Sequence, residues 1–81
     1  MDEAAIRSEV LQALKTIAPE IDPASLRSDR PLREEVDLDS MDWLRFMALL
    51  HQRLGVSIPE EDYWRFNRLD DLVGYLQSHL A

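Results

Sequence analysis

The sequence predicts an all-α fold, a small four-helix bundle with three main helices, one short helix and a long first loop. Apolar residues recur at spacings of three and four along three segments, which is the period of amphipathic helices. Between them, Pro19, Pro23 and Pro31 interrupt regular structure. No segment has a convincing strand pattern or an internal repeat. We therefore expect one domain over residues 1–81.

The first helix is expected over residues 2–18, and Pro19 ends it. Its apolar stripe consists of Ile6, Val10, Ala13, Leu14 and Ile17. Residues 19–39 then form a long connection, with one short helical turn at 22–26. A loop of this length is unusual in a small domain unless it is functional or packed down. We expect Leu26 and Leu32 to anchor it in the core.

The second main helix is expected from Ser40 to Leu54, with Asp39 as its N-cap and Gly55 just past its end. Its core stripe consists of Trp43, Phe46, Met47, Leu50 and Leu54. A second apolar strip on another side of this helix consists of Met41, Leu44 and Ala48, with Arg45 beside it. Because this strip has no evident role inside the fold, it is a candidate docking surface.

Pro59 suits the start of a short helix over residues 60–66, whose first residues are acidic. Asn67 is expected to cap the last helix, from Leu69 to Leu80. The buried stripe of that helix consists of Leu69, Leu72, Val73, Leu76 and Leu80. Gly74 weakens it by up to about 1 kcal/mol relative to alanine.

The chain has 16 acidic and 9 basic residues and a net charge of −7. This charge repels nucleic acid and anionic lipid, so we expect basic protein patches as partners instead. No apolar run approaches the roughly 20 residues that cross a bilayer, and the start lacks a signal-peptide pattern. We expect a cytoplasmic monomer without membrane insertion. Without cysteine, any thioester must use a cofactor's sulfur.

Ser40 lies where the polar loop gives way to the second main helix. A hydroxyl there is close to free backbone N–H groups and to the positive end of the helix dipole, where a phosphate ester is favoured. The simpler interpretation is a helix-start serine whose hydroxyl satisfies a backbone donor.

Catalytic and metal sites are poorly supported. A triad of Ser40, His51 and an aspartate would lack a Gly-x-Ser-x-Gly elbow, and a separation of eleven residues places His51 about 16 Å along the helix. A calcium loop would lack its glycine and closing glutamate. An Asp-x-Asp phosphotransferase centre would need a larger scaffold. We therefore expect no enzyme, and His51 and His79 as surface residues.

Asp39-Ser40-Met41, followed at the family's spacing by Ile58-Pro59-Glu60-Glu61 and the last helix, resembles the acyl carrier protein family. The resemblance runs from about Ile6 to Leu80. It implies that Ser40 bears a covalent 4′-phosphopantetheine arm from coenzyme A, whose thiol holds acyl or aminoacyl groups as thioesters. It also implies that Asp39 helps a phosphopantetheinyl transferase to recognise the chain, and that acyl-loading and acyl-processing enzymes are its other partners.

The chain departs from the family in three places. Asp37 replaces a frequent glycine, and Arg45 replaces a frequent glutamate on a helix that is usually strongly acidic. We therefore expect dedicated partners in a lipid, polyketide or related pathway rather than the general fatty acid enzymes. Trp43 is bulky for a position near the family's acyl pocket, so it either fills the core or narrows that pocket. The expected partner surface consists of Met41, Asp42, Leu44, Arg45 and Ala48.

The alternative function is an unmodified helical adaptor that binds a partner helix through the Met41 strip. The positions of Met1 and of the last helix end, Leu80, favour a free-standing protein.

Overall fold

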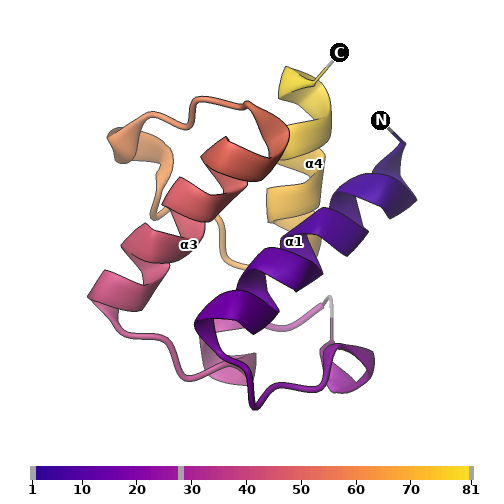
Figure 1. The fold of residues 1–81 in the computed structure, drawn as a ribbon, viewed down its shortest axis with the longest axis vertical. Helices are drawn as coiled ribbons and strands as arrows, with labels where there is room; N and C mark the ends of the chain where they lie inside the picture. Colours follow the sequence, from indigo (N-terminus) through magenta and orange to yellow (C-terminus); the bar gives the residue numbers. More distant parts are fainter. Residues whose placement is uncertain (1, 28, 81) are drawn as a thin grey trace.

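The computed structural model describes residues 2–27 and 29–80, whose regular secondary structure is helical. Figure 1 shows the three main helices, which are α1 (Glu3–Ile17), α3 (Ser40–Leu54) and α4 (Leu69–His79). The shorter elements are α2 (Leu32–Glu35) and the 3-10 helices η1 (Pro23–Ser25) and η2 (Glu60–Asp62). The predicted all-α bundle is thus confirmed, and the main helices agree with their predicted ranges to within one residue at each end.

The helices enclose one core, and α1 packs against both α3 and α4. The side chains predicted to face inward do so. The fully buried ones from the three main helices are Ile6, Val10, Ala13, Leu14, Trp43, Phe46, Met47, Leu50, Leu69, Leu72, Val73 and Leu76. The predicted stripe residues Ile17, Leu54 and Leu80 lie at the edge of this core, partly buried. Burying each large apolar side chain contributes roughly 1.5–3 kcal/mol, so this core holds the bundle together.

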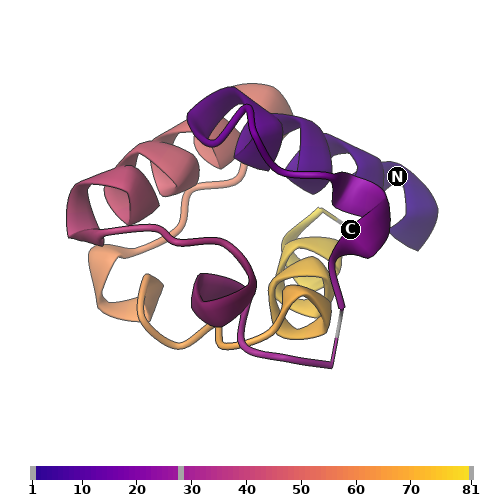
Figure 2. The same ribbon diagram turned by 90° about the horizontal axis from the view of Figure 1, so that it is seen from below.

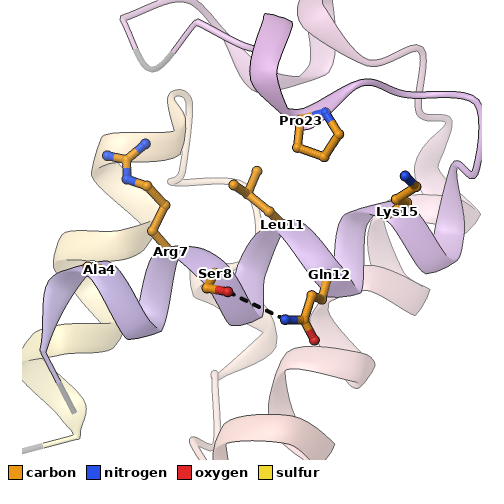
Figure 3. Close-up of a pocket in the computed structure, with 7 residues that line it drawn as sticks. All are labelled: Ala4, Arg7, Ser8, Leu11, Gln12, Lys15 and Pro23. Atoms are coloured by element: carbon orange, nitrogen blue, oxygen red, sulfur yellow. Dashed lines mark hydrogen bonds between the residues drawn. The ribbon is translucent and has the colours of Figure 1, made fainter.

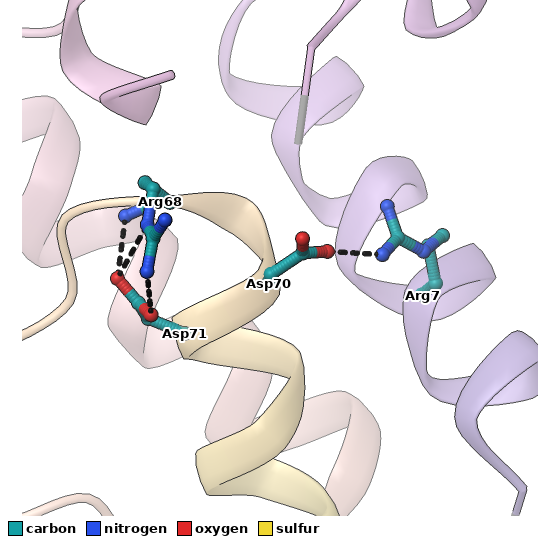
Figure 4. A network of polar contacts seen from close by, with 4 residues as sticks. All are labelled: Arg7, Arg68, Asp70 and Asp71. Carbon is teal, nitrogen blue, oxygen red and sulfur yellow. Dashed lines mark hydrogen bonds and ion pairs between the residues drawn. The ribbon is translucent and has the colours of Figure 1, made fainter. Parts of the chain in front are cut away.

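Ion pairs connect the surfaces of neighbouring helices. Arg7 of α1 contacts Asp70 of α4 with a nitrogen–oxygen distance of 2.6 Å (Figure 4). Arg53 of α3 contacts Glu9 of α1 at 3.0 Å. Because exposed ion pairs contribute only about 0–1 kcal/mol, these contacts add little to the stability that the core provides.

The long loop is packed against the molecule. Leu32, Val36 and Leu38 are buried, and the Leu32 N–H donates a hydrogen bond of 2.7 Å to the carbonyl of Asn67. Figure 2 shows α2 beside the segment that leads into α4. The predicted turn at residues 22–26 is η1, and Leu26 is partly buried, as expected. The helix α2 was not predicted, because its four residues are too few to show a helical period.

Two local predictions are wrong. The short helix expected over 60–66 is the 3-10 helix Glu60–Asp62 followed by turns. The N-cap of α4 is Arg68 rather than Asn67. The Arg68 N–H donates to Asp71 Oδ2 at 3.1 Å, and the Arg68 guanidinium donates to Asp71 Oδ1 at 3.2 Å (Figure 4). The Asn67 carbonyl, meanwhile, receives the bond from the loop.

A side-chain hydrogen bond ties the segment after α3 to α4. The Tyr75 hydroxyl donates to Asp62 Oδ2 at 3.0 Å. Burial, and then this hydrogen bond, raise the pKa of Tyr75. The hydroxyl is therefore the donor at any physiological pH, and it holds η2 against the last helix.

Candidate functional site

Ser40 is the first residue of α3 and is exposed. The residue before it caps the helix, as predicted: Asp39 Oδ1 accepts a hydrogen bond of 2.8 Å from the Asp42 N–H. The Asp39 carbonyl accepts another, of 3.0 Å, from the Trp43 N–H. Within residues 2–27 and 29–80, no group forms a hydrogen bond with the Ser40 hydroxyl. The simpler interpretation of Ser40 as a capping side chain therefore does not hold.

The backbone around Ser40 favours a negative group. The N–H groups of Ser40 and Met41 have no hydrogen-bond partner in the described part of the chain. Free N–H groups and the helix dipole together favour an anion at such an end by about 0.3–1 kcal/mol. The exposed side chains of Asp37 and Asp39 add negative charge close by. The free N–H groups therefore favour an anion at this helix end, and the two carboxylates oppose it.

The predicted second strip of α3 is exposed. Met41 is 67% exposed, Leu44 is 36% exposed, and Ala48 is also at the surface. Arg45 lies beside them, with a nitrogen 3.7 Å from an Asp42 oxygen. A shallow groove adjoins this strip and is lined by Arg45 and Ala48 of α3, with Thr16, Ile17, Leu49 and Gln52. This side of α3 therefore exposes apolar side chains with a cation beside them.

Trp43 lies one turn after Ser40 and belongs to the core, with no exposed surface. Its indole Nε1–H donates a hydrogen bond of 2.6 Å to the Tyr63 carbonyl. The half-exposed Trp64 stacks on it, with ring centroids 6.3 Å apart. The Arg33 guanidinium lies over both rings, 5.9 Å from Trp43 and 5.2 Å from Trp64. This contact could not be predicted from the sequence, because α2, which positions Arg33, is too short to show a helical period.

Two other features lie apart from Ser40. His51 is exposed near the far end of α3, and its Nδ1 is 3.1 Å from the Val56 carbonyl oxygen. Ser40 and His51 therefore do not form a triad. Figure 3 shows an apolar groove across α1 that is closed on one side by Pro23 of η1. Its other lining residues are Ala4, Arg7, Ser8, Leu11, Gln12 and Lys15, all of α1.

Residues 5–76 match the model of the PP-binding family, described as a phosphopantetheine attachment site. The chain belongs to this family. It is 34% identical to "Acyl carrier protein 2" of Ralstonia nicotianae, over 91% of this chain and 95% of that protein. It is 32% identical to an acyl carrier protein of Phytoplasma australiense, over 89% and 99%. It is also 27% identical to a meromycolate extension acyl carrier protein of Mycolicibacterium smegmatis, over 93% and 79%.

Membership in the acyl carrier family confirms the resemblance predicted from Asp39-Ser40-Met41 and its downstream spacing. Acyl carrier proteins are carriers rather than enzymes. They hold a covalently attached 4′-phosphopantetheine and interact with acyl-processing enzymes. Membership in the family therefore favours a carrier over the alternative function, an unmodified helical adaptor. No helix in the described part of the chain is both long and apolar enough to cross a bilayer.

Proposed function

We propose that Ser40 is the attachment point of the phosphopantetheine arm and that this chain is a specialised acyl carrier protein. One observation carries the assignment. The Ser40 hydroxyl is exposed at the start of α3 and has no hydrogen-bond partner among the described residues, while Asp39 performs the capping. A hydroxyl in this position is fixed by a helix yet available to an enzyme.

The modification is a phosphoryl transfer from coenzyme A. Ser40 Oγ forms a bond to the phosphorus that carries pantetheine, and the bond from that phosphorus to the bridging oxygen of the pyrophosphate breaks. Adenosine 3′,5′-bisphosphate leaves, and the hydroxyl proton goes to a base or water in the transferase site. The product is a phosphodiester anion beside the free N–H groups of Ser40 and Met41, where the helix end favours it.

The carrier itself performs no bond-making on its cargo. The thiol at the end of the arm holds the acyl group as a thioester, and the tether raises the local concentration of that group at a docked enzyme. The folded bundle contributes a rigid helix end and a recognition surface. We assign that surface to Met41, Asp42, Leu44, Arg45 and Ala48, which are exposed or half-exposed on α3.

The charge on this surface supports dedicated partners. Arg45 lies beside the apolar strip, with a nitrogen 3.7 Å from an Asp42 oxygen, and its side chain is 64% exposed. A basic patch on an enzyme that suits an acidic carrier helix would meet this cation and be repelled. Partners that present a carboxylate opposite Arg45 fit better. We therefore place the chain in a lipid, polyketide or related pathway with enzymes of its own.

The attachment is tested by intact-protein mass spectrometry. The unmodified chain is incubated with coenzyme A, Mg²⁺ and a broad-specificity phosphopantetheinyl transferase. We expect the wild type to gain the mass of one phosphopantetheine group and Ser40→Ala to gain none. Ser57→Ala, which changes another exposed serine, is the matched control and should behave as the wild type does. A folded wild type that gains no mass would overturn the proposal.

A further inference from the structure

Trp43 is the first buried residue of α3 after Ser40. Trp43 follows Ser40 by three residues, about one helical turn, and its side chain has no exposed surface. An acyl group on an arm at Ser40 would gain stability by reaching apolar surroundings. The first interior position on its way is already filled by the indole.

The indole is fixed on three sides. Its Nε1–H bond of 2.6 Å to the Tyr63 carbonyl ties α3 to the segment after η2. The Phe46 ring packs edge-on against it, at a centroid distance of 5.5 Å. The Trp64 ring stacks nearly parallel to it on the solvent side, at an interplanar angle of 23°. A chain that entered here would have to break the hydrogen bond and separate the rings.

Arg33 adds a third segment to this closure. Its guanidinium lies within 6 Å of the centroids of both indole rings, a distance at which cations are attracted to aromatic faces. Arg33 belongs to α2, which is fixed by the Leu32–Asn67 backbone bond and by the buried side chain of Leu32. Three separate parts of the chain, α2, α3 and the segment after η2, therefore meet over the core at this point.

Three grooves on the surface of the described residues lie away from this part of the core. The grooves across α1, at the first loop and between α1 and α3 are lined by none of the α3 core residues. Those residues are Trp43, Phe46, Met47 and Leu50.

From these contacts we infer that the stack of Arg33, Trp43 and Trp64 closes the core beside Ser40, so that the acyl group on the arm stays outside the protein. This inference rests on the proposed attachment at Ser40. The stack thereby removes burial as a source of cargo preference: a long alkyl chain gains nothing over a short or polar acyl group.

The reactivity of the thioester tests the inference on the full chain. The arm is loaded as its acetyl or its octanoyl thioester, and the rate of cleavage by hydroxylamine is measured. Free S-acetyl and S-octanoyl pantetheine are the controls, which correct for the intrinsic reactivity of each thioester. Every methylene that became buried would favour the protected state about fourfold. We expect octanoyl protection below about fourfold relative to acetyl after this correction, because one buried methylene would already reach that value; greater protection overturns the inference.

A spectroscopic measurement reports on the stack itself. The chain has two tryptophans, and a Trp64→Phe variant assigns their two indole N–H signals in a ¹⁵N-labelled sample. The Trp43 signal should have the same chemical shift in the acetyl and octanoyl forms. A shift that is present only in the octanoyl form would show the chain against Trp43 and would overturn the inference.

A variant tests whether the stack is the barrier. Trp43→Leu leaves a void beside Ser40, and its octanoyl thioester should gain protection of about fourfold or more over that of the wild type. A folded Trp43→Leu protein without that gain contradicts the role given to Trp43. If the variant does not fold, the two wild-type measurements decide. Failure of the proposed function is distinguishable, because the chain would then gain no arm before any thioester is measured.

Discussion

At the scale of single residues, Asp39 and Ser40 divide two tasks between neighbours. Asp39 caps the first turn of α3 by accepting a hydrogen bond from the Asp42 N–H, and the hydroxyl of Ser40 has no hydrogen-bond partner among the described residues. Both positions could be predicted from the sequence, because capping and helix starts depend on residues that are adjacent in the chain. The contact of Arg33 with Trp43 and Trp64 could not be predicted, because Arg33 and Trp64 lie in segments that lack a periodic pattern.

Substitutions at Asp39 separate capping from recognition. Asp39→Ala removes the acceptor of the Asp42 N–H and should lower the free energy of unfolding by about 1 kcal/mol. Asp39→Asn retains an acceptor and should leave stability near that of the wild type. If the transferase recognises the carboxylate, both variants should be modified more slowly. Denaturant unfolding and the rate of mass gain measure the two effects, and an Asn variant modified at the wild-type rate would contradict the recognition role.

At the scale of elements, the two glycines make a matched pair. Gly55 ends α3 in the left-handed region, with φ of 69°, whereas Gly74 lies inside α4 with open space at its Cα. Gly55→Ala should destabilise the protein by about 1 kcal/mol or more, because a side chain disfavours that backbone conformation. Gly74→Ala should stabilise it by up to about 1 kcal/mol, because alanine favours a helix interior. Unfolding curves that show the same sign for both would contradict this description of the two helices.

The start of α4 gives a pH dependence. The hydrogen bonds from Arg68 lower the pKa of Asp71. A carboxyl whose pKa is lower in the folded state stabilises the protein above its unfolded pKa, near 3.9, and loses that contribution as the pH falls through the folded value. Asp71→Asn should therefore be less stable than the wild type at pH 7, and the difference should shrink toward pH 2. A difference that does not change with pH, measured by thermal unfolding, would exclude this role of the charge.

The elements also show where sequence patterns stop being informative. The three main helices were predicted closely because each spans several turns of a regular apolar period. By contrast, α2 was not predicted, and the helix over residues 60–66 was predicted too long, because each segment is short and its conformation depends on tertiary contacts. The hydrogen bond from the Leu32 N–H to the Asn67 carbonyl illustrates this, because it joins the first loop to the segment before α4 and no local pattern in the sequence predicts that contact.

At the scale of the whole molecule, the charge is divided unevenly. The net charge is −7, yet residues 41–54 of α3 contain only one acid, Asp42, against Arg45 and Arg53. Arg53 is engaged with Glu9, so Arg45 is the more open of the two cations. The molecule is therefore acidic overall, while its proposed docking surface carries a cation in its centre.

A charge reversal tests this arrangement. In the phosphopantetheine-bearing form, Arg45→Glu should raise turnover by a general fatty-acid ketosynthase by up to about fivefold at low salt, since exposed pairs contribute about 0–1 kcal/mol. The gain should fall as salt is added. Arg30→Glu, an equal change of net charge on the first loop, is the control. The account of dedicated partners fails if the wild type already matches an ordinary carrier and Arg45→Glu changes nothing.

The most direct measurement of the central claim is the position of the arm. Trypsin cleaves after Arg33 and Arg45, and the peptide between them, residues 34–45, contains Ser40 as its only hydroxyl-bearing residue. After modification and digestion, tandem mass spectrometry should find the phosphopantetheine on this peptide and on no other. An arm on a different peptide, or a fully folded chain that the transferase leaves unmodified, would contradict the assignment of Ser40.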